Sequence, residues 1–329
     1  MGNVVISTPG MPLPSEKLFR KQTLVERLRK GDEAIHLLTM AGGWSIILIT
    51  GLLVHHLWVY SRIARHQFGW HFLVTSTWDP VNGLFGAWPF VYGTVVTSLL
   101  ALIIAIPIGL GAAIFLAELA PRGVSNALTF LIELLAAVPS VVYGLIGIFL
   151  LIPTLTAIMP TFQKFFGWIP IFSGTFYGVS YFSAAVILAI MVVPFIVSIS
   201  REVLLAVPVA QREAMMALGA TKWEVTWRTV VPYARQGIMG SVFLALARAL
   251  GETMAVTMVI GNVAQVSTSL MAPGYTIAAV IANEFTEATG DLYLHALIEL
   301  GLVLFAVTMI INALARLLML SVRTHEVAL

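Results

Sequence analysis

The chain contains no cysteine, and only 10% of its 329 residues are charged. The absence of cysteine excludes disulfides, thiolate nucleophiles and thiolate metal sites. Soluble globular domains carry about 25% charged residues. A chain with 59% hydrophobic residues and a mean hydropathy of +0.95 lacks the polar surface that folding in water requires. Because helices satisfy their own backbone hydrogen bonds in lipid, we expect an all-α membrane protein that crosses the bilayer several times.

Other absences concern chemistry. The sequence has no G-x-x-x-x-G-K-[ST] motif for binding nucleotide phosphates and no activated serine arrangement. His55 and His56 are adjacent, so their side chains point to different faces, and no third ligand is spaced to complete a metal site. We therefore expect no enzymatic activity, metal or cofactor in this chain, and no nucleic-acid partner. The first 14 residues lack a basic start followed by an apolar core, so we expect the first span to act as an uncleaved insertion signal.

Six apolar runs are long enough to span a bilayer, for which a helix needs roughly 20 residues. Pro107, Pro139 and Pro194 lie inside three of these runs, where we expect bends rather than breaks. The sequence thus predicts a transmembrane bundle over residues 37–329. The expected spans cover about residues 37–60, 90–117, 125–152, 179–200, 237–261 and 294–320.

The distribution of positive charge predicts the orientation. Of the 18 Lys and Arg residues, 14 lie on the side that holds the N-terminal tail, the loop 201–235 and the C-terminal end. The positive-inside rule therefore places both termini in the cytoplasm of a cell inner-membrane protein. Within the basic tail, residues 1–36, apolar residues at helical intervals predict an amphipathic helix on the membrane surface, and a flexible tail is the alternative.

The cytoplasmic loop contains PVAQREAMMALGATKWEVTWRTVVP, residues 208–232, which predicts two short helices. Pro208 is suited to the first turn of the first helix, and Gly219 to the left-handed position that ends it. Thr221 and Glu224 have the spacing of a capping box that begins the second helix. The hairpin presents small residues and two tryptophans. We interpret this combination as a docking surface, and a hairpin that folds back on its own bundle is the alternative.

The loop resembles the coupling motif of ABC importer permeases, in which Glu-Ala-Ala is followed at fixed spacing by Gly and by Ile-x-Leu-Pro. Glu213, Ala214, Gly219 and Pro232 match this pattern, whereas Met215, Thr229 and Val231 replace an Ala, the Ile and the Leu. The resemblance implies that the loop docks on a separate ATPase subunit. The residues expected to take part are Arg212, Glu213, Ala214, Gly219, Ala220 and Trp223.

Further segments resemble the permeases of phosphate-specific ABC importers. These are IPIGLGAAIFLAELAP (106–121), AVPSVVYGL (137–145), RALGETMAVTMVIGN (248–262) and TIAAVIANEF (276–285), and the last two favour the PstC-type subunit over the PstA type. The resemblance implies a type I ABC importer permease fold and half of a translocation path. The implied partners are a PstA-type permease, two ATP-binding cassette subunits that use ATP and Mg, and an extracytoplasmic phosphate-binding protein.

Arg248 and Glu252 stand in the fifth apolar run, four residues apart and so on one face of the expected helix. An ionisable group in the middle of a membrane costs roughly 2.5–3.5 kcal/mol on insertion scales, so such groups face the bundle interior or an aqueous path. We interpret Arg248 as a forked phosphate contact and Glu252 as an acceptor for the P–OH proton of the substrate. The alternative is a pair that only fixes helix packing.

Hydroxyl groups near this pair are further candidates for the path: Ser140, Tyr143 and Thr253, each with a packing role as the alternative. Four other carboxylates receive expectations from their positions. Glu133 is expected near the middle of the third span, Glu299 at the outer interface and Glu118 at a cytoplasmic helix end. An acidic outer loop with Glu284 is expected to be solvated or to face a binding protein.

Two other classes of function compete with an import permease. A secondary transporter or channel for another oxyanion would use coupling-ion sites and often shows inverted repeats, and we see no such repeat. A sensor or assembly protein would use the loop to recruit an enzyme, but it has little use for an intramembrane Arg and Glu.

Overall fold

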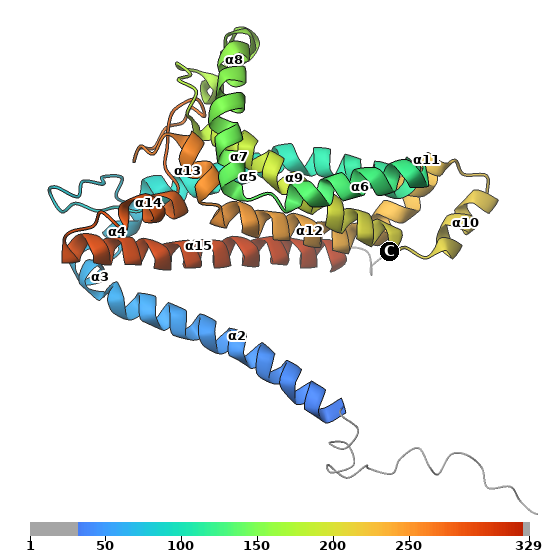
Figure 1. Ribbon diagram of the computed structural model, residues 1–329, viewed down its shortest axis with the longest axis horizontal. Coiled ribbons are helices and arrows are strands. Elements are labelled where there is room, and N and C mark those ends of the chain that lie inside the picture. Colours follow the sequence, from blue (N-terminus) through green and yellow to red (C-terminus); the bar gives the residue numbers. More distant parts are fainter. Residues whose placement is uncertain (1–31, 325–329) are drawn as a thin grey trace, which may run out of the picture. The chain divides into compact units, whose positions relative to one another are not determined.

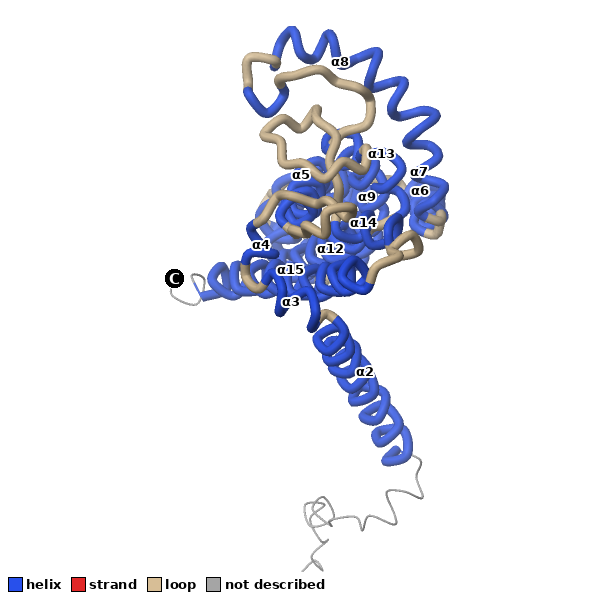
Figure 2. Tube along the Cα trace, turned by 90° about the vertical axis from the view of Figure 1, so that its left-hand side faces the viewer, coloured by secondary structure: helices blue, strands red, loops and turns tan. Residues whose placement is uncertain are grey.

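The computed structural model describes residues 32–324, and every regular element of that range is helical (Figures 1 and 2). Within it, six helical segments are long and apolar enough to cross a membrane. This agrees with the all-α, six-span expectation. The expected amphipathic helix of the tail lies outside the described residues. The six segments are Ile35–Tyr60, Trp88–Leu119, Ser140–Phe166, Tyr181–Leu205, Lys222–Gly251 and Asp291–Leu317.

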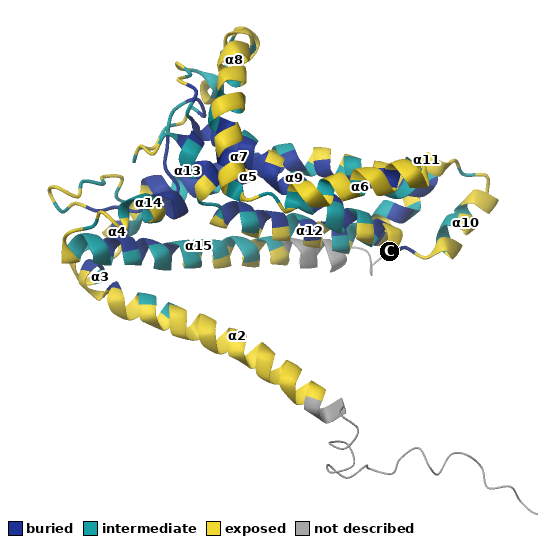
Figure 3. Ribbon diagram, viewed as in Figure 1, coloured by how far each residue is buried: buried dark blue, intermediate teal, exposed yellow. Residues whose placement is uncertain are grey.

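The contacts divide the chain into two compact units, Met1–His56 and Leu57–Leu329. The described part of the first unit is most of helix α2 (Asp32–Tyr60), whose side chains are almost all exposed (Figure 3). Exposed apolar side chains around a whole helix are typical of a surface that faces lipid. The boundary expected from the sequence, at residue 36, separates the basic tail from the first apolar run. The boundary between the two compact units lies further along the chain, between His56 and Leu57 of α2.

The second unit holds the remaining helices. Three π-helical stretches occur in its described residues: η2 forms the end of a membrane-spanning helix, whereas η3 and η5 lie within such helices. In chain order the elements are α3 (Arg62–Phe68), α4 (His71–Val74), α5 (Trp88–Ile114), η2 (Phe115–Leu119), α6 (Arg122–Ala136), α7 (Ser140–Ile146), η3 (Gly147–Leu151), α8 (Ile152–Phe166), η4 (Pro170–Phe172), α9 (Tyr181–Leu205), α10 (Val209–Ala217), α11 (Lys222–Val225), η5 (Thr226–Val230), α12 (Val231–Gly251), α13 (Met254–Ile260), α14 (Ile277–Glu284) and α15 (Asp291–Thr324).

Helix α9 is the centre of this unit, because α5, α6, α12 and α13 all pack on it and most of its side chains are buried (Figure 3). Small residues permit the close approach. A Cβ at Gly109 of α5 would lie 2.8 Å from Ile196 of α9, and a Cβ at Gly237 of α12 would lie 2.3 Å from Val203. The hydroxyls of Ser200 and Ser241 share a hydrogen bond of 2.8 Å between α9 and α12. Close packing of this kind holds helices together where lipid removes the hydrophobic driving force.

The helix is interrupted at Pro139, where we expected only a bend, so the expected third span of residues 125–152 is wrong. Helix α6 ends at Ala136, Pro139 is extended with ψ 141°, and the membrane-spanning helix runs over Ser140–Phe166. A proline lacks an N–H group and disfavours helical backbone at the residue before it, which explains the break. Glu133 is therefore not in the middle of a span but lies exposed on α6.

Pro107 and Pro194, in contrast, lie inside the continuous helices α5 and α9, as expected. The expected fifth span of 237–261 is also wrong, because α12 ends at Gly251 and the chain turns at Glu252 before α13 begins. Glu252 has an extended backbone with ψ 129°. This interruption bears directly on the candidate site.

Candidate functional site

Arg248 lies in the last turn of α12, at the interrupted end of a membrane-spanning helix. Its side chain is half buried, and its guanidinium carbon lies 4.3 Å from the centre of the Phe195 ring on α9. A guanidinium over an aromatic face is a favourable cation–π arrangement. Its buried Nε, however, has no hydrogen-bond partner in the described part of the chain. The arginine is held in place while part of its hydrogen-bonding capacity stays unused.

Glu252 does not stack on Arg248 as the sequence predicts. The helix ends one residue before Glu252, and no ion pair joins the two side chains in residues 32–324. Instead, Oε1 of Glu252 accepts a weak hydrogen bond of 3.3 Å from the backbone N–H of Ala255, in the first turn of α13. The expectation of one shared helix face was wrong, because it assumed that the apolar run 237–261 is one helix.

Thr253 follows Glu252 directly, and its side chain forms its hydrogen bond only with backbone of a neighbouring residue in the described part of the chain. Its Oγ1 lies 3.4 Å from the carbonyl oxygen of Gly251, and its own carbonyl accepts a hydrogen bond from the Thr257 hydroxyl. Glu252 and Thr253 are both half buried. They form the non-helical joint between α12 and α13, next to the end of α12 that carries Arg248.

Tyr143 of α7 lies close enough to Arg248 for an electrostatic interaction between the phenol and the guanidinium. Its side chain is 4% exposed, and its hydroxyl donates to the carbonyl oxygen of Leu135 at 2.7 Å. Helix α7 packs closely on α13, because a Cβ at Gly144 would lie 2.3 Å from the sulfur of Met258. Ser140, the first residue of α7, is half buried. The structure thus brings α7 and its tyrosine to the α12–α13 joint.

Phe195 was missed by the sequence reasoning. It follows Pro194 on α9, and nothing in its local sequence distinguishes it from the other apolar residues of that helix. Only the packing of α9 against α12 shows that its ring faces Arg248.

The hairpin has the predicted local structure. Gly219 has a left-handed φ of +85°, which favours glycine. The capping box is complete: the Glu224 carboxylate accepts from the Thr221 N–H at 2.9 Å, and the Thr221 hydroxyl oxygen accepts from the Glu224 N–H at 3.3 Å. These contacts stop α10 and begin α11 at the predicted residues.

One face of the hairpin is exposed and apolar. The rings of Trp223 and Trp227 lie 5.5 Å apart at 68°, and Leu218 between the two helices is 84% exposed. Glu213, Ala214 and Gly219 are also exposed, and Ala220 is half buried. The opposite side packs on the bundle through buried residues such as Val225. The hairpin therefore rests on its own bundle with one face and leaves its aromatic face open.

Arg212, predicted to contact the ATPase, turns toward the permease instead. Its guanidinium forms an ion pair of 2.8 Å with Glu118 of η2 and donates hydrogen bonds to the carbonyl oxygens of Leu204 and Val207. Both charged side chains are mostly buried, 16% and 12% exposed. The pair anchors α10 to the ends of α5 and α9, and no local signal in the sequence indicated it.

At the opposite end of the second unit, Glu284 is not a solvated acid. Its Oε2 accepts hydrogen bonds from the Trp78 indole at 2.8 Å and from the Tyr293 hydroxyl at 2.6 Å. Burial raises the pKa of the neighbouring Tyr275 hydroxyl to about 12. Glu299 lies two turns from the start of α15, near the end where it was expected, and it is buried, with only 5% of the residue exposed. At this end Glu299 is therefore buried, and Glu284 is half buried and hydrogen-bonded.

Residues 32–324 contain no group of three His, Asp or Glu side chains that could hold a metal ion. The candidate site therefore consists of a partly unsatisfied arginine beside a helix joint, together with a hairpin at one end of the bundle whose aromatic face is exposed. What such a site serves is indicated by comparison with known proteins.

The family of binding-protein-dependent transport system inner membrane components matches residues 105–324. A phosphate transport system permease protein PstC of Mesorhizobium japonicum is 46% identical over 315 residues, covering 94% of this chain and 96% of that protein. PstC of Xylella fastidiosa is 46% identical over 295 residues, covering 88% and 90%. PstC of Pasteurella multocida is 41% identical over 318 residues, covering 94% and 99%.

Among solved structures, a bacterial alginate ABC transporter in complex with a periplasmic protein superimposes with a TM-score of 0.55 at 15% identity, covering 89% of this chain and 95% of that one. At this identity the likeness shows a common fold only. The match over residues 105–324 and the high identity over nearly the whole chain show the family directly: the chain belongs to the binding-protein-dependent transport system inner membrane components, among the PstC-type permeases.

Proposed function

We propose that this chain is the PstC-type permease subunit of an ATP-driven phosphate importer and forms half of the translocation path. The observation that carries the proposal is Arg248, a half-buried guanidinium with an unpartnered Nε at the joint where a membrane-spanning helix ends. A planar, forked guanidinium suits phosphate better than the point charge of a lysine does. A transport site also has to release its ion, so a few charged contacts serve better than a complete cage.

Glu252 contributes in two ways under this proposal. Its hydrogen bond to Ala255 fixes the start of α13 and so the shape of the joint beside Arg248. Its Oε2 has no hydrogen bond in residues 32–324 and serves as an acceptor for a protonated phosphate oxygen, while an unprotonated oxyanion meets only repulsion. Tyr143, Ser140 and Thr253 complete the lining of the path near this joint.

The hairpin couples the permease to separate ATPase subunits. Its exposed tryptophans and small residues form the docking face, whereas Arg212 positions the hairpin through Glu118. We expect a PstA-type permease as the companion in the membrane, two ATP-binding cassette subunits that hydrolyse ATP with Mg, and an extracytoplasmic phosphate-binding protein. The hairpin then lies in the cytoplasm, as do both termini.

Reconstitution in proteoliposomes tests the proposal. The vesicles contain this chain, the companion permease, the ATPase subunits and the binding protein. They are expected to take up radiolabelled phosphate only when ATP is present on the side of the membrane that carries the ATPase subunits. Arg248→Ala should abolish uptake while the complex still assembles. The control is Arg62→Ala, which removes an exposed arginine of α3. Uptake by this chain alone on an ion gradient, or normal uptake by Arg248→Ala, would contradict the proposal.

A further inference from the structure

Glu299 is a buried carboxylate without a sufficient partner. It lies on α15, two turns from the start of the helix at Asp291, and only 5% of the residue is exposed. Its Oε2 is buried and has no hydrogen bond in the described part of the chain. An unpaired polar atom in an apolar interior is strongly unfavourable, and buried polar groups in native proteins normally have a partner. The described part of the chain therefore leaves hydrogen-bonding capacity of this carboxylate unused, which a bound molecule could satisfy.

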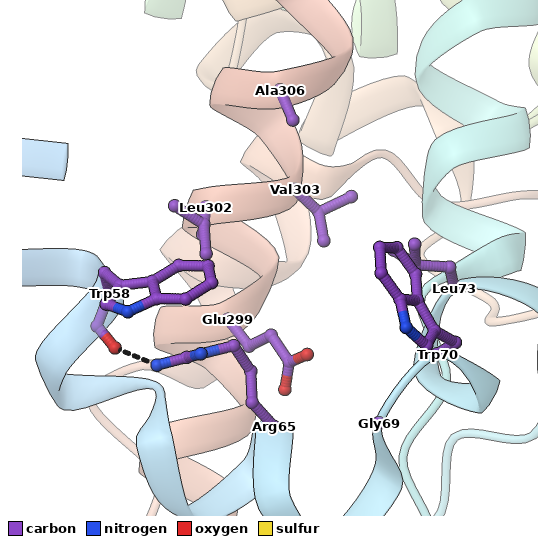
Figure 4. A pocket seen from close by; sticks show the side chains of 9 residues that line it. All are labelled: Trp58, Arg65, Gly69, Trp70, Leu73, Glu299, Leu302, Val303 and Ala306. Carbon is purple, nitrogen blue, oxygen red and sulfur yellow. Dashed lines mark hydrogen bonds between the residues drawn. The ribbon is translucent and has the colours of Figure 1, made fainter.

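The side chain of Glu299 lines a cavity of about 350 Å³ (Figure 4). The cavity lies between α15, the α3–α4 segment and the last turn of α2, all within the second unit. Its volume is in the range of small-molecule sites, and most of its wall is apolar. The carboxylate, the Arg65 guanidinium and the ring of Trp70 surround the same space (Figure 4).

Arg65 supplies a second charge, of opposite sign, which interacts electrostatically with Glu299 without direct contact. Its Nε donates to the Ser61 hydroxyl at 2.9 Å, its Nη2 donates to the Trp58 carbonyl oxygen, and its guanidinium carbon lies 3.6 Å from the centre of the Trp58 ring. No ion pair joins it to Glu299 in residues 32–324. Nη1 keeps its donors free of protein hydrogen bonds within that range, and a guanidinium offers five N–H donors in all.

The wall beyond the two charges is suited to a hydrocarbon chain. Leu302, Val303 and Ala306 follow Glu299 along one side of α15, and the distance from Glu299 to Ala306 is about 10 Å along the helix axis. Trp58 and Trp70 stand at the charged end of the cavity, and tryptophans of this kind mark the membrane–water interface. The cavity thus has a charged end with both signs and an apolar end in the bilayer.

We propose that this cavity binds a phospholipid whose headgroup carries a primary ammonium. The ammonium donates a charge-assisted hydrogen bond to the Glu299 carboxylate, the phosphate accepts from Nη1 of Arg65, and one acyl chain lies along Leu302, Val303 and Ala306. A trimethylammonium headgroup has no N–H to donate to the carboxylate. A glycerol headgroup has no cation, and a free anion would meet the repulsion of Glu299. The site is independent of the ion that the permease transports.

Native mass spectrometry of the full chain, titrated with lipids of identical acyl chains, tests this proposal. We expect phosphatidylethanolamine to bind at least about 10-fold more tightly than phosphatidylcholine or phosphatidylglycerol, which corresponds to one charge-assisted hydrogen bond of about 1.4 kcal/mol. Glu299→Gln should remove that preference. The control is Glu287→Gln, which neutralises an exposed carboxylate outside the cavity and should keep it.

A second measurement needs no variant. Stepwise N-methylation of phosphatidylethanolamine removes the N–H donors while it keeps the charge, and the affinity of the unmodified chain should fall with the last methyl group. Equal binding of the ethanolamine and choline lipids would overturn the proposal, as would an ethanolamine preference that survives in Glu299→Gln. A competition experiment with soluble phosphoethanolamine separates headgroup binding from lipid binding. If phosphoethanolamine displaces the lipid at equal concentration, the site does not bind a lipid as such and the proposal is wrong.

Discussion

The guanidinium of Arg212 and the carboxylate of Glu118 meet at 2.8 Å although 94 residues separate them in the chain. Arg212 belongs to the hairpin helix α10, and Glu118 belongs to η2, the π-helical end of the second membrane-spanning segment. Because the same guanidinium also donates to the carbonyl oxygens of Leu204, in the last turn of α9, and of Val207, just after it, it joins the hairpin to two helices of the core. A movement of the hairpin would therefore displace these helices through the contacts of the Arg212 side chain.

Glu118→Gln removes the charge that Arg212 faces. Removing one partner of a buried pair leaves the other uncompensated, and we expect a loss of about 2–3 kcal/mol in the free energy of unfolding. In the assembled transporter, stimulation of ATP hydrolysis by the loaded binding protein should fall. Glu202→Gln is the control, since Glu202 pairs with Arg201 but is itself 69% exposed, and an ion pair with a solvent-exposed carboxylate contributes under about 1 kcal/mol. Equal effects of the two variants would contradict the anchoring role.

Trp223→Ala should weaken the binding of the ATPase subunits. Buried aromatic anchors at interfaces are worth about 2 kcal/mol or more, so the dissociation constant should rise by at least about 30-fold. Surface plasmon resonance with the permease pair in nanodiscs measures it. Trp168→Ala provides a matched control, because Trp168 is 81% exposed after α8 and does not belong to the hairpin. Unchanged ATPase affinity in Trp223→Ala would place the docking face elsewhere.

Glu252→Gln tests selectivity. The amide oxygen can still accept from the Ala255 N–H, so α13 should keep its start, but the negative charge is gone. We expect ATP-driven phosphate uptake to fall about 10-fold and the preference for phosphate over sulfate to narrow. Competition between the two radiolabelled anions in proteoliposomes measures both quantities. If neither changes, Glu252 does not read the proton of the substrate.

Gly93→Ala should destabilise the second unit. A Cβ at this position of α5 would lie 2.1 Å from the carbonyl oxygen of Tyr275, which cannot move without the loop before α14. Overpacking of this kind costs about 1–3 kcal/mol and should appear as a lower melting temperature in detergent. Gly111→Ala on the same helix is the control: no atom lies within 4 Å of its added Cβ, so it should be neutral or slightly stabilising. A melting temperature of Gly93→Ala equal to that of the control would show that the loop gives way freely.

The sequence predicted those features that depend on short stretches of chain. The apolar runs indicated six spans, and Gly219, Thr221 and Glu224 indicated where the hairpin helices stop and begin. Each of these signals acts through backbone conformation or hydrogen bonds within a few residues. Nothing beyond the local sequence is needed to interpret them.

Features that depend on packing were not predictable in the same way. Pro107 and Pro139 both stand in apolar runs, yet the first lies inside a helix and the second ends one, because the surrounding helices decide whether the break is tolerated. The burial of Glu299 depends on α3 and α4 packing against α15. The contact between Arg248 and Phe195 joins two helices that the sequence alone cannot pair.

The joint at Glu252 has a mechanical consequence. From its first residue to Arg248, α12 is one uninterrupted helix of about 25 Å, and η5 connects its first turn directly to the hairpin. Helix α12 ends at Gly251, and α13, which follows the joint, packs against α7. A displacement of the hairpin would therefore be passed along α12 to the end that carries Arg248, whereas α13, on the other side of the joint, is held by its own contacts with α7 and α9.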